Sequence, residues 1–396
     1  MNASQPEGLD EKIAGMVKGL APHLIALRRD IHAHPELGFD THRTAEVIAQ
    51  ELQRLGFEPQ TGVGKTGVML DIHGAESGPS LLLRADMDAL PIEEKTGLPY
   101  ASVWPGKMHA CGHDLHTATL LGVAATLKEL QPLLKGSVRL IFQPAEETTE
   151  SGAAAMIADG AADGQDMAIT FHNRPELAVG NILLTRGAST ASCDEFDVQV
   201  IGISGHAARP HAAADPIVAT AYLITQLQTI ISREMDPAQS AVLTVGHIEG
   251  GAIHNIIPDS CLFRGTVRAR SAASRDHVEA AFRRVCAGVA LSMNVKVEIN
   301  YQRGVPPLLN DDRMVDLAEQ SITRQFKQQP EVQQGRSFGA EDFSYFSDRV
   351  PACQIHIGSA QPGRNDHVHN SDYQPDEGCI SVGAIALTRL TLDILS

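Results

Sequence analysis

The sequence lacks the features that mark exported and membrane-bound proteins. No apolar run in its 396 residues approaches the roughly 18 needed to cross a bilayer. The first ten residues have neither the basic region nor the apolar region of a secretory signal. The six cysteines are scattered without a Cys-x-x-Cys pair, which suits reduced thiols. We therefore expect a cytoplasmic protein with no membrane partner.

Basic residues are also scarce. Lysine and arginine number 32 against 48 aspartates and glutamates, which gives a formal net charge of −16. Because this charge repels a phosphate backbone, nucleic acid is not an expected partner. Charged residues make up 20% and apolar residues 43% of the chain, as in globular proteins. At roughly 100–200 residues per domain, the length predicts two or three domains.

Several common functional motifs are missing as well. The chain has no Gly-x-Ser-x-Gly and no His-Glu-x-x-His, the local signatures of serine hydrolases and zincins. The segment 62–67 contains Gly-Lys-Thr in a glycine-rich setting, but Pro59 stands where a phosphate-binding loop needs glycine. Such loops also precede a helix, whereas 68–72 is typical of a strand. Nucleotide binding is therefore not expected.

Both ends of the chain alternate helices and strands. Apolar periodicity predicts helices over 10–31 and 42–55, the second capped by Thr41, and a further helix over 116–130. Short strands are predicted at 68–72, 81–83, 138–142 and 167–171. The pattern resumes with a strand at 354–357 and a helix from Gly378. This alternation predicts an α/β fold.

The middle of the chain follows a different order. Strands are predicted at 196–201, 242–248, 261–267 and 295–301. One helix starts at Asp215-Pro216 and another is expected to be capped by Ser274. The order β-α-β-β-α-β predicts a ferredoxin-like α+β domain. We therefore expect an inserted domain at 185–303 within a larger α/β domain formed by 1–184 and 304–396.

Potential metal ligands are concentrated between His109 and His116, where three histidines, a cysteine and an aspartate lie within eight residues. A single histidine is more often an ordinary core or surface side chain. Five such residues together favour a metal site. Cysteine with histidine suits zinc, and a nearby carboxylate also admits manganese or cobalt.

Four predicted strands lead into carboxylates or histidines. Ligands of open α/β sheets bind at the carboxyl ends of the strands, so convergence on one metal site explains this repeated placement. In an adjacent pair of glutamates, one can ligate an ion while the other accepts a proton from metal-bound water. The residues concerned are Asp86, Asp88, Glu146, Glu147, His172, His367 and His369.

Five segments resemble the motifs of a known family and appear in its order. They are Arg-Ala-Asp-Met-Asp-Ala-Leu-Pro from Arg84, His-Ala-Cys-Gly-His-Asp-Leu-His from His109, Phe-Gln-Pro-Ala-Glu-Glu from Phe142, Gly-His-Ala-Ala-Arg-Pro-His from Gly205 and Gly-Ala-Glu-Asp-Phe from Gly339. From about Leu27 onward, the chain resembles the amidohydrolase branch of the aminoacylase and carboxypeptidase metallopeptidase family, typified by hippurate hydrolase and plant indoleacetyl-amino-acid hydrolases. The cysteine-containing motif is specific to this branch.

The resemblance implies both a fold and a reaction. The fold would be a metallopeptidase-like catalytic domain, with a mixed sheet flanked by helices, and an inserted lid that pairs two subunits into a homodimer. The reaction would be hydrolysis of the amide bond of an N-acyl amino acid. A dipeptidase of the same family and a non-catalytic relative are the alternatives, and benzoyl, acetyl, succinyl and indoleacetyl groups are all open as the acyl group.

The resemblance also implies roles for individual residues. Glu146 would be the general base, and Cys111 would bridge two divalent ions (Zn, Mn, Co or Ni) that polarise the scissile carbonyl and activate water. Asp86 stands where other branches have a metal-binding histidine and Asp88 where they have an orienting carboxylate, and both roles are open here. The implied metal ligands are Cys111, His113, Glu147, His172 and His369.

Three lid residues complete the site that the resemblance implies. His206 resembles a histidine that relatives contribute from the partner subunit to stabilise the oxyanion, and that role requires a dimer. Asn255 and Arg268 resemble residues that hold the substrate carboxylate, a task that suits the forked guanidinium of arginine. Because the lid histidine must approach the metals when substrate binds, we also expect the lid to close.

Overall fold

The computed structural model describes residues 8–335 and 337–396 and divides the chain into two compact units. The main unit contains the residues up to Ser189 together with Leu309–Gly335 and Asp342–Ser396. The inserted unit contains Thr190–Leu308 and the described residues of the 337–341 segment. Each unit has its own apolar core.

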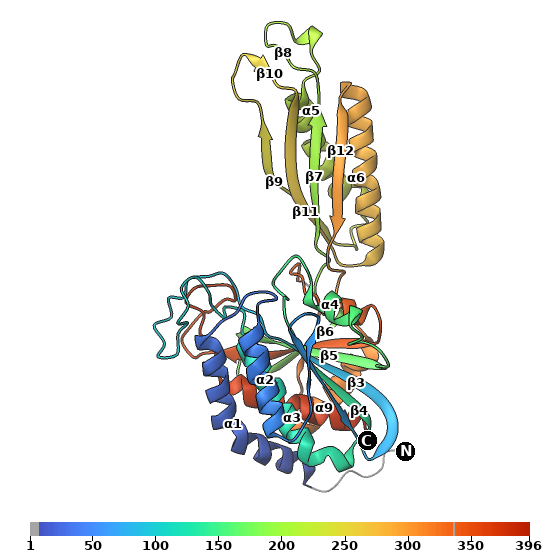
Figure 1. Cartoon of the computed structure of the whole chain (residues 1–396). Helices are drawn as coiled ribbons and strands as arrows, with labels where there is room; N and C mark the ends of the chain where they lie inside the picture. The colour runs from blue at the N-terminus through green and yellow to red at the C-terminus, as the bar shows by residue number, and fades with distance from the viewer. Residues whose placement is uncertain (1–7, 336) are drawn as a thin grey trace. The chain divides into compact units, whose positions relative to one another are not determined.

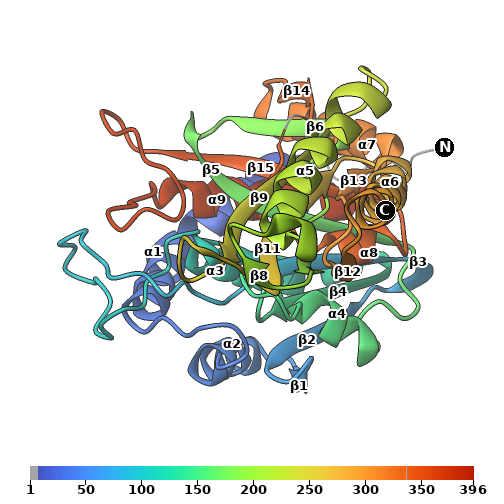
Figure 2. The same ribbon diagram turned by 90° about the horizontal axis from the view of Figure 1, so that it is seen from above.

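The main unit is built on a nine-stranded mixed sheet (Figures 1 and 2). Its strand order is β1-β2-β4-β3-β5-β15-β6-β13, and β14 pairs with β6 outside this path. The neighbours β4, β3, β5 and β15 are parallel, so their carboxyl ends lie at the same edge. The strands are β1 Gln60–Val63, β2 Gly67–His73, β3 Glu76–Asp86, β4 Lys135–Gln143, β5 Met167–Ala178, β6 Ile182–Ala188, β13 Leu309–Asn310, β14 Glu331–Gln334 and β15 Ala352–Ala360.

Helices flank this sheet, as the sequence predicts. The α1, α3 and α9 helices pack against one another, and α3 and α9 also contact the sheet. The α4 and α8 helices form a separate contacting pair, in which α4 contacts β4 and α8 contacts β15. Apolar side chains such as Leu24 of α1, Leu120 of α3 and Leu387 of α9 are fully buried between these layers. The helices are α1 Leu9–Ala33, α2 His42–Arg54, α3 His113–Leu130, η1 Gln131–Leu133, α4 Gly152–Ala158, α7 Asp312–Phe326, α8 Ser344–Ser347 and α9 Gly378–Ile394.

The inserted unit has the predicted β-α-β-β-α-β order. Its antiparallel sheet has the order β12-β7-β11-β9, and α5 and α6 pack against it. Asp215 caps α5, because its carboxylate accepts hydrogen bonds from the amides of Ile217 and Val218. The elements are β7 Asp194–Ile201, β8 Gly205–His206, η2 Pro210–Ala212, α5 Pro216–Thr229, η3 Ile230–Glu234, β9 Ala241–Gly250, β10 Ile256–Ile257, β11 Ser260–Ala269, α6 Ala272–Met293 and β12 Lys296–Arg303.

Some predicted details are wrong. The cap of α6 is Ser271, whose hydroxyl accepts a hydrogen bond from the amide of the expected cap, Ser274. Thr41 precedes α2, but its hydroxyl bonds to Thr66 instead of capping the helix. The third helix begins at His113, before the expected 116, because Gly112 supplies a left-handed turn into it. Segment 62–67 spans the end of β1, the turn at 64–66 and the start of β2, so a strand and not a helix follows the Gly-Lys-Thr, as predicted.

The boundaries of the insertion also differ from the expected 185–303. The inserted unit runs from 190 to 308, because β6 continues to Ala188 and pairs there with Leu309 of β13. Residues of the 337–341 segment also belong to it, although they were expected in the other domain. Their contacts explain this, since the amide of Ala191 donates to the Gly339 carbonyl at 2.9 Å.

The core of the inserted unit depends on its aromatic side chains. The ring of Phe282 is fully buried, with its centroid 4.7 Å from that of Phe196. We expect Phe282→Ala to lower the free energy of unfolding of this unit by about 3–5 kcal/mol, because it leaves a cavity. Chemical denaturation of the full chain measures this. Leu291→Ala is the control, because Leu291 lies on the same helix with 87% of its surface exposed. Equal denaturation midpoints for the two variants would contradict the prediction.

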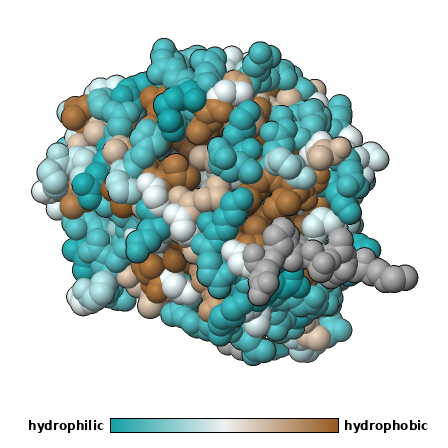
Figure 3. Space-filling view, turned by 90° about the horizontal axis from the view of Figure 1, so that it is seen from below, coloured by the Kyte–Doolittle hydropathy of each residue, from teal (hydrophilic) through white to brown (hydrophobic). Residues whose placement is uncertain are grey.

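Polar side chains cover most of the face shown in Figure 3, where apolar side chains gather in separate patches. Within 8–335 and 337–396, no helix combines the length and the apolar character needed to cross a membrane.

Candidate metal centre

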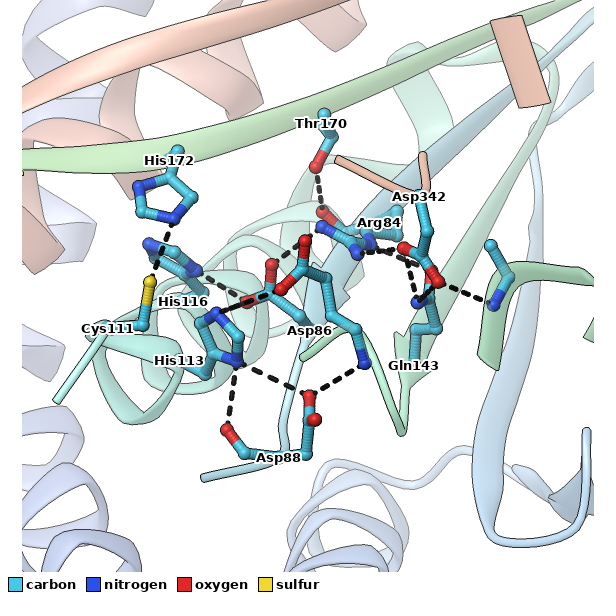
Figure 4. Close-up of polar contacts among 12 residues, drawn as sticks. Arg84, Asp86, Asp88, Cys111, His113, His116, Gln143, Thr170, His172 and Asp342 are labelled. Carbon is cyan, nitrogen blue, oxygen red and sulfur yellow. Dashed lines mark hydrogen bonds and ion pairs between the residues drawn. The ribbon is translucent and has the colours of Figure 1, made fainter. Parts of the chain in front are cut away.

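The predicted ligands of the main unit meet at the carboxyl edge of its parallel strands. Figure 4 shows three of them, Cys111, His113 and His172, beside Asp86 and Asp88. β3 ends at Asp86, and the two glutamates follow the end of β4 at Gln143. His172 lies within β5 rather than after it, because this strand continues to Ala178. Residues from strands far apart in the sequence therefore share one site, as the predicted parallel order requires.

Cys111 belongs to two adjacent groups of potential ligands. The ligand atoms of Cys111, His113 and His172 all lie within 4.8 Å of one another, and so do those of Cys111, Glu147 and His369. The Sγ of Cys111 is 3.4 Å from His172 Nε2, and His369 Nε2 is 3.1 Å from Glu147 Oε1. A cysteine sulfur shared by two groups is the arrangement that a bridging ligand would require.

In both His113 and His172, a hydrogen bond occupies Nδ1 of the ring, so Nε2 is the nitrogen available to bind a metal. Nδ1 of His113 donates to the Asp88 carbonyl at 2.9 Å, and Nδ1 of His172 donates to the Asn173 carbonyl at 2.7 Å. Metal-binding histidines almost always donate through their other nitrogen in this way. Nε2 of His113 is buried and has no hydrogen-bond partner among the described residues. The residues present therefore fit divalent metal ions.

Both ring nitrogens of His116, in the same motif, are hydrogen-bonded. Its Nδ1 is 2.5 Å from Asp86 Oδ1, and its Nε2 accepts a hydrogen bond from the Asn173 amide at 2.9 Å. Burial lowers its pKa to about 4, so the ring is neutral at physiological pH. We therefore assign His116 to support of the site rather than to metal binding.

The two aspartates whose roles the sequence leaves open have defined contacts. Asp88 accepts hydrogen bonds from the backbone amides of Glu146 and Glu147, at 3.0 and 3.1 Å. It thereby fixes the turn that presents both glutamates. Asp86 is fully buried and bonded to Arg84 and His116. Burial opposes its ionisation, but His113, His116 and Arg84 outweigh that effect and hold its pKa well below the usual value.

Unusual backbone conformations fix three positions around the ligands. Gly112 has φ of 90°, and a Cβ added there would lie 2.3 Å from Nδ2 of Asn173. That Nδ2 donates to the Cys111 carbonyl at 2.6 Å, so only glycine allows this close approach. Ala145 and His369 are in left-handed conformations with φ of 54° and 66°. Such strain in non-glycine residues concentrates at functional sites.

Two ligands of this site, Cys111 and His113, hold protons at neutral pH when no metal is bound. Burial, together with the charges of Glu147 and Glu146, raises the pKa of the Cys111 thiol well above its usual value. Burial alone would lower the pKa of His113, but Asp86, Asp88 and Glu147 outweigh it and raise the pKa to about 10. A metal ion must therefore displace protons from both side chains.

We expect metal affinity to rise with pH between 6 and 8. Both groups are protonated below their raised pKa values, so affinity should increase about tenfold per pH unit for each proton displaced. Calorimetric titration of chelated protein with Zn²⁺ in buffers of different ionisation enthalpy counts these protons. Zn²⁺ binding to the Cys111→Ser variant should release one proton fewer than binding to the parent. Cys353→Ser changes a buried cysteine elsewhere, so this variant should release the same number of protons as the parent. A proton count that Cys111→Ser does not change would contradict the prediction.

The inserted unit brings His206 and Asn255 together. His206 of β8 pairs with Ile256 of β10, and the Asn255 carbonyl accepts a hydrogen bond from the Ala207 amide at 3.0 Å. His206 is exposed, and its Nδ1 accepts a hydrogen bond from the Ala208 amide at 3.0 Å. Because Nδ1 is the acceptor, a neutral His206 carries its proton on Nε2 and presents it as a donor.

Arg268 lies at the other end of β11 from this pair. The chain passes from β10 to Ser260, where β11 begins, and Arg268 is about 27 Å further along at roughly 3.4 Å per residue. Nη1 of Arg268 donates to the Phe338 carbonyl at 2.8 Å. Within one inserted unit, the predicted carboxylate-binding residues Arg268 and Asn255 are therefore too far apart to hold one small substrate.

Histidines, a thiol and paired carboxylates at the carboxyl edge of a parallel sheet define a metal-dependent hydrolase. Sequence comparison agrees with this class, because the profile of the peptidase family M20/M25/M40 matches residues 82–393. The chain belongs to this family, and its relatives place it in the amidohydrolase branch that the sequence motifs indicate.

Two of these relatives have named activities. The chain is 43% identical over 361 residues to N-acetyl-L-cysteine deacetylase of Bacillus subtilis, covering 91% of this chain and 85% of the relative. It is 37% identical over 373 residues to hippurate hydrolase of Campylobacter jejuni, covering 93% and 96%. Among solved structures, it matches a B. subtilis protein described as a dinuclear metal binding peptidase of the M20 family, with 34% identity, a TM-score of 0.85 and coverage of 96% and 99%.

Proposed function

We propose that this protein hydrolyses the amide bond of N-acyl amino acids at a site for two divalent metal ions. The observation that carries the proposal is the position of Cys111 in two adjacent ligand groups, with Glu146 close to one of them. Oε2 of Glu146 is 4.0 Å from His113 Nε2. Relatives named as a deacetylase of N-acetylcysteine and as a hydrolase of hippurate support an acylated amino acid as the substrate.

The residues of the site have separate roles in the proposed reaction. Ions bound by Cys111, His113, Glu147, His172 and His369 would polarise the scissile carbonyl and lower the pKa of water. Glu146 accepts the proton of the attacking water and passes it to the leaving amine. Asp88 holds the backbone of Glu146 in place for this transfer. Nε2 of His206 donates to the oxyanion as negative charge develops on it.

We propose that the active site is completed by a homodimer. Because Arg268 and the His206–Asn255 pair lie at opposite ends of one inserted unit, two copies can supply them to the same substrate. β9 is an edge strand and exposes Val242 and Ile248, and α5 beside it exposes Ile217 and Tyr222. An apolar sheet edge that pairs with no further strand of residues 8–335 and 337–396 favours pairing with a second copy.

Amino-acid release from a panel of N-acyl amino acids tests the proposed reaction. The panel contains benzoylglycine, N-acetyl, N-succinyl and N-indoleacetyl amino acids, and chelated protein is assayed with and without Zn²⁺, Mn²⁺, Co²⁺ or Ni²⁺. We expect metal-dependent release of the amino acid. Free-amine dipeptides serve as the comparison, because a 34% identical relative is named a thermostable carboxypeptidase. Cleavage of free-amine dipeptides alone would replace the proposal with a peptidase activity.

A further inference from the structure

Three motif residues without an assigned role meet in a buried network beside the candidate metal centre (Figure 4). They are Arg84, Gln143 and Asp342, from three of the five segments that resemble the family. Nε of Arg84 donates to Gln143 Oε1 at 2.9 Å, and its Nη2 donates to Asp342 Oδ1 at 2.9 Å. Gln143 Nε2 donates to the same carboxylate at 2.8 Å. All three side chains are buried.

Asp342 is held from two further directions. Its Oδ2 accepts hydrogen bonds from the Ser151 hydroxyl at 2.7 Å and from the Ala153 amide at 3.1 Å. The carboxylate is therefore surrounded by donors, which an ionised acceptor satisfies and a neutral amide does not. Asp342 is also the residue at which the chain returns to the main unit after the 337–341 segment.

The network continues from Arg84 toward the metal ligands. Nη1 of Arg84 donates to Asp86 Oδ2 at 2.6 Å, and Asp86 Oδ1 bonds to His116. His116 accepts from the Asn173 amide, and the Asn173 side chain donates to the Cys111 carbonyl. A continuous path of buried hydrogen bonds thus runs from Asp342 to the backbone of the shared ligand Cys111.

Because this path contains buried ion pairs, replacement of any one of its charged side chains affects the others. Arg84 lies between the carboxylates of Asp86 and Asp342 and compensates both, and removal of one partner of a buried ion pair leaves the other charge uncompensated. Asp86 Oδ1 is also 3.7 Å from His113 Nε2, the nitrogen available to a metal. A shift of Asp86 therefore changes the surroundings of that nitrogen directly.

We propose that Arg84, Gln143 and Asp342 are positioning residues for the metal centre. They hold Asp86 and, through it, His116 and Asn173, so that the ligands on α3 and β5 keep the spacing that the ions require. This inference rests on the metal site of the proposed function. It assigns a role to Arg84, Gln143 and Asp342 without making any of them a metal ligand.

Cobalt binding tests this role independently of activity. Chelated full-length protein is titrated with Co²⁺, and the thiolate-to-cobalt and visible absorption bands report affinity and ligand geometry. Asp342→Asn keeps the side-chain size but places an amide group among donors. We expect it to weaken Co²⁺ binding on the order of 10–100-fold and to change the bands, as loss of an outer partner of metal ligands does.

The control is a buried ion pair in the inserted unit. Arg275 donates to Asp194 at 2.5 and 3.0 Å, and the two side chains are largely buried. Arg275→Gln should lower the unfolding temperature but keep the parental Co²⁺ affinity and spectrum. If Arg275→Gln lost as much Co²⁺ affinity as Asp342→Asn, general destabilisation of the fold would explain both losses, and the proposal would be overturned.

Gln143→Met provides a second variant should Asp342→Asn lack the parental circular dichroism spectrum. Methionine is of similar length, but it removes the donor to Asp342 and the acceptor for Arg84 Nε. A weaker, spectrally altered cobalt site in Gln143→Met supports the proposal. Parental affinity and spectra in the folded variants overturn it. A parent protein that binds no Co²⁺ would instead refute the metal centre itself, so the two failures are distinguishable.

Discussion

Replacement of Glu146 with glutamine is expected to lower kcat on the order of 10²–10⁴-fold, the usual contribution of a general base, while metal content stays at the parental value. Glutamine has the same shape but cannot accept the proton of the attacking water. The backbone amide of residue 146 still bonds to Asp88, so the turn that presents the side chain is kept. Turnover of the substrate that the panel identifies and elemental analysis of the purified variant measure the two quantities.

Two neighbouring glutamates provide the controls for this experiment. Glu150 is exposed and pairs with Lys65 at 2.5 Å, so Glu150→Gln should retain parental kcat. Glu147→Gln should lose metal as well as activity, because Glu147 belongs to the proposed ligand set. A Glu146→Gln enzyme with near-parental kcat would show that another group acts as the base.

A mixture of two inactive variants is expected to recover activity if His206 acts across the dimer. Glu146→Gln and His206→Ala each inactivate both sites of their own homodimer. In a mixed dimer, one of the two sites has an intact Glu146 from one subunit and an intact His206 from the other. Random exchange of equal amounts in a two-fold dimer should restore roughly a quarter of parental activity.

Co-expression with two different affinity tags isolates the mixed dimers for this assay. The matched control combines Glu146→Gln with Cys111→Ala, two changes in the same metal centre. Each site of that mixed dimer carries one of the two defects, so no activity should return. Isolated mixed dimers of Glu146→Gln and His206→Ala that remain inactive would place His206 in the active site of its own chain.

The sequence predicts at which edge of the sheet the site lies, because carboxylates and histidines follow the ends of buried strands. This local pattern brings Asp86, Glu147 and His369 to one place without any knowledge of their distances. It also predicts the two-unit organisation, since the order of strands and helices changes in the middle of the chain. Periodicity and spacing carry this information because strand direction fixes where each side chain emerges.

Other features depend on contacts that no local pattern contains. Arg84 and Asp342 are 258 residues apart in the sequence, so their ion pair could not be predicted from spacing. His116 looks like a ligand in the sequence because its motif is rich in histidine, but two hydrogen bonds occupy its ring. The left-handed conformation of Ala145 is also invisible in the sequence, since alanine does not favour it.

The inserted unit interrupts what is otherwise a simple β-hairpin. Ala188 of β6 pairs directly with Leu309 of β13, while the first and last strands of the insertion pair Asp194 with Arg303. Both units therefore have adjacent chain ends at the junction, the arrangement that favours gain, loss or exchange of a whole domain. Removal of 190–308 leaves Ala188 and Leu309 as neighbours that a short turn can join, although it also removes the contacts of the 337–341 segment. All five proposed metal ligands lie in the main unit, so an insertion of this kind can be gained, lost or exchanged without interrupting the segments that carry them.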